Sequence, residues 1–84
     1  MDMAKLVQDI RDRHRGKRVF GATFEFSNDD SVRAFRQKTG AFAKTFPNGG
    51  SRLIRAEFAP GLEGRIVSAA VDEGGTYCGP CGRI

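Results

Sequence analysis

The sequence predicts one α+β domain, with a small, mostly antiparallel sheet of three to four strands and two helices packed on one face. Two segments show helical spacing of apolar residues, two alternate like half-buried strands, and one is apolar on both faces; Gly-rich turns separate several of them. At 84 residues the chain has room for a single domain, 1–84, and not for a deep cofactor cavity. We expect the order α-β-α-β-β, followed by an irregular tail, 72–84.

The first helix is expected over residues 3–15, with an apolar face made by Met3, Leu6, Val7 and Ile10. Asp2 is its N-cap and Gly16 ends it. Residues 18–26 alternate as in a strand. The face expected to be buried carries Phe20, Ala22, Phe24 and Phe26.

Residues 27–30 supply the start of a second helix, expected over 29–39. Its apolar pattern continues to Phe46, so residues 41–46 could extend the helix. Alternatively, Gly40 is a left-handed cap and residues 42–46 form a short strand. The sequence leaves both interpretations open.

Residues 47–50 are the strongest turn signal, and residues 52–58 alternate like another half-buried strand. Residues 60–64 are short enough for a hairpin connection. The apolar run 65–71 is expected to be a central strand because both of its faces have low polarity. The face of the sheet away from the helices would be partly open, presenting Thr23, Glu25, Arg55 and Glu57.

The charge is concentrated in one segment. The chain carries 14 Lys and Arg and 10 Asp and Glu, a net charge of +4. Residues 11–18 account for all of this excess, which is typical of a surface that contacts phosphates or an acidic protein. The alternative is a solvated helix end whose cations favour the helix dipole. The candidate binding residues are Arg11, Arg13, His14, Arg15, Lys17 and Arg18.

Residues 24–35 are similar to the passage from the third strand to the second helix of RNA-recognition motifs, and residues 50–58 to their final strand. Residues 18–23 depart from the family's aromatic strand, because they lack its first Gly and its second stacking aromatic. We therefore expect Phe20, Phe24 and Phe26 to form the core. Nucleic acid would then be bound by contacts of the basic segment with the backbone.

Residues 77–81, Tyr-Cys-Gly-Pro-Cys, resemble the active site of thioredoxin-like oxidoreductases. The resemblance implies a nucleophilic Cys78 and a resolving Cys81. Only three residues follow, too few for the helix whose dipole lowers the first thiol's pKa in that family. The same pair is half of a tetrahedral zinc site, completed across a homodimer or by His14 and a carboxylate. Two free thiols or a local disulfide are the simpler interpretations.

No hydrolase or transferase constellation is recognisable, and His14 is the single histidine. The sequence therefore predicts a non-enzymatic binding module for nucleic acid or a nucleoprotein. The alternative is a small protein inhibitor or accessory factor that binds a protein surface, similar to anti-CRISPR proteins of mobile elements in size only. The first residues resemble no signal peptide and no apolar run could span a membrane, so we expect a cytoplasmic protein.

Overall fold

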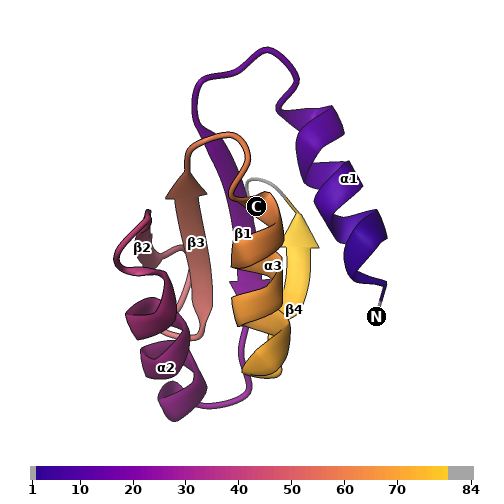
Figure 1. Ribbon diagram of the computed structural model, residues 1–84. Helices are drawn as coiled ribbons and strands as arrows, with labels where there is room; N and C mark the ends of the chain where they lie inside the picture. Colours follow the sequence, from indigo (N-terminus) through magenta and orange to yellow (C-terminus); the bar gives the residue numbers. More distant parts are fainter. Residues whose placement is uncertain (1, 80–84) are drawn as a thin grey trace.

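The computed structural model describes residues 2–79, which form three helices and a four-stranded antiparallel sheet. The elements are α1 (Met3–Arg13), β1 (Phe20–Glu25), α2 (Asp29–Thr39), β2 (Ala43–Pro47), β3 (Leu53–Phe58), α3 (Glu63–Asp72) and β4 (Thr76–Gly79). The sheet order is β2-β3-β1-β4, with α2 and α3 over one face and α1 alongside α3 at the β4 edge (Figure 1). The predicted α+β fold class is confirmed.

From β1 onwards the order β-α-β-β-α-β is the split β-α-β arrangement of ferredoxin-like domains, preceded here by α1. The central strands β1 and β3 pair antiparallel, with Phe20 opposite Phe58 and Phe24 opposite Ile54. Residues 24–35 therefore run from the first strand of this unit to its first helix. In RNA-recognition motifs the similar passage runs from the third strand to the second helix. The similarity therefore does not extend to the position of these residues in the sheet.

The phenylalanine face of β1 is the centre of the core, as its alternation predicts. Phe20, Ala22 and Phe24 are buried, and the Phe24 ring lies 5.8 Å from that of Phe35 on α2. Phe26 packs on the same α2 ring at 5.0 Å. These side chains join the helices to the sheet, so they are not available as a base-stacking surface.

The predicted helix starts are confirmed. Asp2 accepts a hydrogen bond from the Ala4 backbone N–H at 3.0 Å, and Asn28 accepts one from Ser31 at 2.8 Å. Helix α1 ends at Arg13 with His14 as its C-cap, two residues before the predicted end. Gly16, which was expected to end the helix, lies in the turn that follows, with a φ of 81°. Gly40 is right-handed, with φ −60° and ψ −25°, so the expected left-handed cap is wrong. The strand interpretation of the open segment is correct, since β2 begins at Ala43.

The prediction of a strand over 65–71 is wrong, because this run is most of helix α3. Its apolar residues also fit a helix: Ile66, Val67 and Ala70 fall on one buried side. Helix α3 lies between α1 and α2 over the sheet, and its polar residues Arg65, Ser68 and Asp72 are spaced three and four residues apart, as on one side of a helix. The low polarity of the run therefore belongs to a helix rather than to a central strand.

Two further expectations are corrected. The tail is not irregular throughout, since β4 pairs with β1 and adds the fourth strand at the edge of the sheet. On the sheet face away from the helices, Glu25 is exposed and Arg55 and Glu57 are partly exposed, as expected, but Thr23 is fully buried. Residues 80–84 lie outside the described part of the chain.

Candidate functional site

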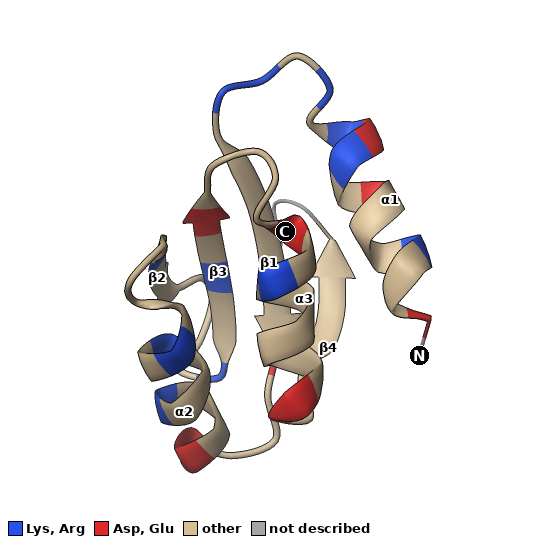
Figure 2. Cartoon of the chain, viewed as in Figure 1, with Lys and Arg blue, Asp and Glu red and all other residues tan. Residues whose placement is uncertain are grey.

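The predicted basic segment spans the end of α1 and the link to β1 (Figure 2). The structure divides it into two groups of side chains. Three arginines are held by carboxylates of the chain, and two cations of the link have no carboxylate partner within residues 2–79.

Arg11 is anchored to the fold. Its Nε donates to Oε2 of Glu63 at 2.6 Å, and the Glu63 side chain is 3% exposed. Oε1 of Glu63 accepts the Gly61 backbone N–H at 2.8 Å. Burial acts to raise the pKa of Glu63, but the hydrogen bonds from Arg11 and from backbone N–H groups outweigh it and hold that pKa below its usual range. This ion pair connects α1 to α3.

Asp9 forms a second connection of α1. It accepts the Tyr77 hydroxyl at 2.7 Å and Nε of Arg13 at 2.9 Å. The hydrogen bond from Tyr77 has the largest effect on the pKa of Asp9, and together with the bond from Arg13 it lowers that pKa. Arg15 contacts Asp12 at 2.9 Å, but its side chain remains 80% exposed. Such exposed pairs are worth about 0–1 kcal/mol, so Arg15 can exchange Asp12 for a phosphate at little cost.

His14 is a structural residue, not a surface contact. It is 5% exposed, and its Nδ1 lies 2.8 Å from the Ile10 carbonyl oxygen. Its Nε2 accepts the Gly21 backbone N–H at 3.0 Å, which assigns the proton to Nδ1. The ring also stacks on Phe20, with centroids 5.1 Å apart. His14 therefore fixes the link to β1, and the expectation that it joins the binding surface is not met.

Lys17 and Arg18 are exposed in that link, and neither makes an ion pair within the described residues. Arg18 lines a groove of about 530 Å³ at the end of the sheet where β1 begins and β3 ends. Lys44 lies on the same groove, also without an ion-pair partner in residues 2–79. We call this surface the loop end; its cations are Arg15, Lys17, Arg18 and Lys44.

Lys44 and the apolar side chains of this groove were not among the binding residues that the sequence predicts. Lys44 lies 26 residues after Arg18 in a segment whose structure was undecided, so only the β2–β3–β1 pairing brings them together. Val19 is 57% exposed. The strand alternation was the available signal, because it places Val19 on the face opposite the buried phenylalanines.

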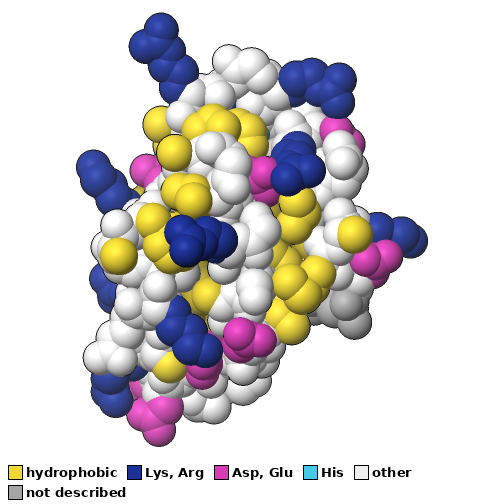
Figure 3. All heavy atoms as spheres, viewed as in Figure 1, with side chains coloured by type: hydrophobic (Ala, Val, Ile, Leu, Met, Phe, Trp, Pro, Cys, Tyr) yellow, Lys and Arg dark blue, Asp and Glu magenta, His cyan; other side chains and the backbone are white. Residues whose placement is uncertain are grey.

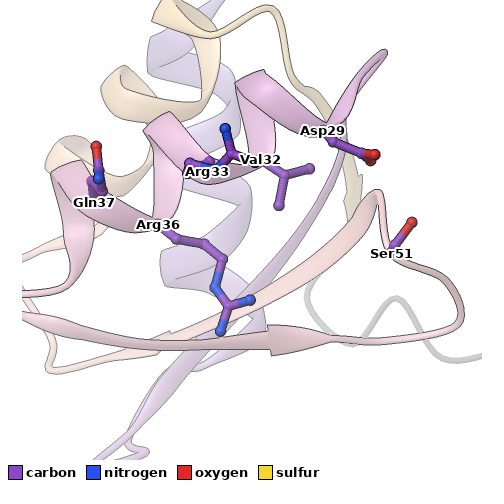
Figure 4. Close-up of a pocket in the computed structure, with 6 residues that line it drawn as sticks. All are labelled: Asp29, Val32, Arg33, Arg36, Gln37 and Ser51. Carbon is purple, nitrogen blue, oxygen red and sulfur yellow. The ribbon is translucent and has the colours of Figure 1, made fainter.

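A second groove, of about 590 Å³, lies between α2 and the β2–β3 turn (Figure 4). Arg36 extends across it and donates to Oγ1 of Thr45 at 3.1 Å and to the Thr45 carbonyl at 3.2 Å. Asp29 at its rim accepts from Arg52 at 3.2 Å. The charged groups at both ends of this groove therefore already bind other residues of the chain. Their contacts hold α2 against the β2–β3 hairpin.

Cys78 is an exposed free thiol whose Sγ lies 3.4 Å from the Thr76 carbonyl. Burial and the neighbouring charge of Glu25 raise its pKa, which is the opposite of thiolate activation. Cys81 lies outside the described residues. Within residues 2–79 no three His, Cys, Asp or Glu side chains are grouped so that they could hold a metal ion.

Comparison with known proteins gives no match to a protein-family model, to a curated protein or to a solved structure. Among the described residues, no helix has both the length and the apolar character needed to cross a membrane. Any functional argument therefore starts from the side chains of the loop end.

Proposed function

We propose that this chain is a non-enzymatic binding module whose loop end contacts the phosphate backbone of nucleic acid, free or within a nucleoprotein. The observation that carries the proposal is the exposed pair Lys17 and Arg18, with Lys44 across the groove. None of the three has a carboxylate partner in residues 2–79. Glu57, the one described carboxylate lining the groove, accepts Nε of Arg55 at 3.2 Å.

The paired arginines contribute unequally to such a surface. Arg11 stays with Glu63, because removing it would leave a buried carboxylate without its partner. Arg15 is free to turn to a phosphate, as argued above from its exposure. The proposed contact set is therefore Arg15, Lys17, Arg18 and Lys44. Contacts of this kind carry no sequence information and depend strongly on salt.

Fluorescence anisotropy with a mixed-sequence oligonucleotide tests the proposal. We expect affinity to fall steeply with salt, with a log–log slope of about −3 for three to four phosphate contacts. The double variant Lys17→Glu, Arg18→Glu should weaken binding at least about tenfold. The matched control is Lys5→Glu, Arg33→Glu, which changes the charge equally at the start of α1 and on α2. No binding at ~50 mM salt, or an equal loss in both double variants, would overturn the proposal.

A second candidate function is a small inhibitor or accessory factor that binds an acidic protein surface. The exposed Val19 beside Arg18 favours it, because apolar side chains at the centre of a polar rim are typical of protein interfaces. Salt-tolerant capture of one protein from nuclease-treated lysate, lost in Val19→Asp, would support this function instead.

A further inference from the structure

The groove of the loop end has an apolar floor that phosphate contacts leave unexplained. Val19, Phe42, Phe58 and Ala59 line it, and Arg18 and Lys44 carry the charge at its rim. Figure 3 shows hydrophobic side chains gathered at the upper left of the molecule, with Lys and Arg side chains around them. The backbone contacts proposed above involve only sugar and phosphate, so they would leave this floor empty.

Phe42 adds an aromatic ring to this floor. It is only partly buried, and the Arg65 guanidinium lies 5.2 Å from its ring centroid. Arg65 lines a separate pocket against α3, whereas Phe42 lines both that pocket and this groove. A partly exposed aromatic ring is a surface on which the bases of a single strand stack. The groove thus combines cations at its rim with an apolar, partly aromatic floor.

The neighbouring strand edge argues against an extended peptide as the occupant. Peptides that enter a groove beside a sheet usually add a strand, using the backbone groups of the edge. On the edge strand β2, the Thr45 carbonyl already accepts Arg36 at 3.2 Å, and Pro47 has no N–H to donate. A peptide therefore could not add a full strand along this edge.

We infer that the groove receives an unpaired base of a single-stranded nucleic acid, while Arg18 and Lys44 contact the phosphates on either side. This inference rests on the proposed function and names the class of nucleic acid. A single strand matches the groove in two ways. Its phosphates carry the negative charge that the rim attracts, and its unpaired bases are planar groups that can pack on the apolar floor.

Three labelled probes at one salt concentration test the inference: a dT 12-mer, a 12-bp duplex, and a 12-mer of abasic sites with the charge of the dT strand. We expect the dT strand to bind about tenfold more tightly than either of the others. Val19→Ser should remove most of this preference and leave duplex binding and the salt slope unchanged. The control, Met3→Ser, alters another exposed apolar side chain, 37% exposed, at the far end of α1.

Equal affinity for the dT strand, the abasic strand and the duplex would overturn this inference and leave the proposed function standing. No binding to any of the three would refute the proposed function itself. A peptide of alternating Asp and Phe that displaces the dT strand at lower concentration than unlabelled dT would assign the groove to a protein partner. A preference for dT that survives in Val19→Ser would place the base elsewhere on the chain.

Discussion

Replacement of His14 tests how the loop end is held in place. The His14→Ala variant removes a side chain that is 5% exposed and leaves the Gly21 N–H of β1 without its acceptor. An unsatisfied buried donor costs about 1–3 kcal/mol, and truncating a buried ring adds a cavity term of similar size. We expect the free energy of unfolding to fall by about 2–4 kcal/mol, which lowers Tm by about 10–25 °C in a domain of this length.

Two further variants separate the hydrogen bonds of His14 from its packing. His14→Phe keeps a ring that can stack on Phe20 but loses both hydrogen bonds, so it should retain only part of the stability. His14→Gln can still accept the Gly21 N–H and should lose less than the Phe variant. The assay is thermal and urea unfolding followed by circular dichroism, with oligonucleotide affinity measured on each folded variant.

The neighbouring variant Lys17→Ala is the control, since an exposed side chain should change stability by less than about 0.5 kcal/mol. If His14→Phe unfolds at the same denaturant concentration as the wild type, the hydrogen bonds of the imidazole do not hold the link. The assignment of His14 as the residue that positions the loop end would then be refuted.

Two predictions concern the rest of the fold. The pKa values of Glu63 and Asp9 are lowered from 4.5 and 3.8, so both stabilise the fold above these values and stability should fall as acid protonates them. Glu63→Gln should flatten this decline in urea titrations between pH 5 and about pH 2; an unchanged decline contradicts it. Gly75→Ala places a Cβ 2.7 Å from the Phe26 ring and should cost about 1–3 kcal/mol. Gly64→Ala in α3 meets no atom within 4 Å and should raise Tm; a loss of stability there would contradict the reasoning.

The parts of the fold that depend on neighbours in sequence were predictable. The N-caps Asp2 and Asn28 and the buried phenylalanine face of β1 are set within a few residues, and the structure confirms them. Helix α3 was predicted as a strand although Arg65, Ser68 and Asp72 are spaced three and four residues apart, because a short apolar run fits either period. Strand β4 is four residues long and follows two glycines, so its pairing with β1 supplies the order that its own sequence does not.

The candidate site was predictable only in its position. The excess of charge pointed to the α1–β1 link, where Lys17 and Arg18 are exposed. Arg13 and Arg15 pair with carboxylates four and three residues away, but two other contacts of α1 are remote in sequence. Glu63 is 52 residues from Arg11, and Tyr77 is 68 residues from Asp9. Neither contact leaves a local signal, so the division of the cluster into anchored and available side chains required the tertiary structure.

The two side-chain anchors of α1 on Glu63 and Tyr77 bear on how the chain matures during synthesis. During synthesis α1 leaves the ribosome before α3 and β4, so it cannot make these two contacts until the residues of α3 and β4 have emerged. Helix α1 therefore completes its side-chain contacts late in synthesis. The link that carries Lys17 and Arg18 takes its final position at the same stage. A chain that ended before Tyr77 would contain every cation of the loop end. It would still lack the Tyr77–Asp9 hydrogen bond, one of the two side-chain contacts that hold α1 in place.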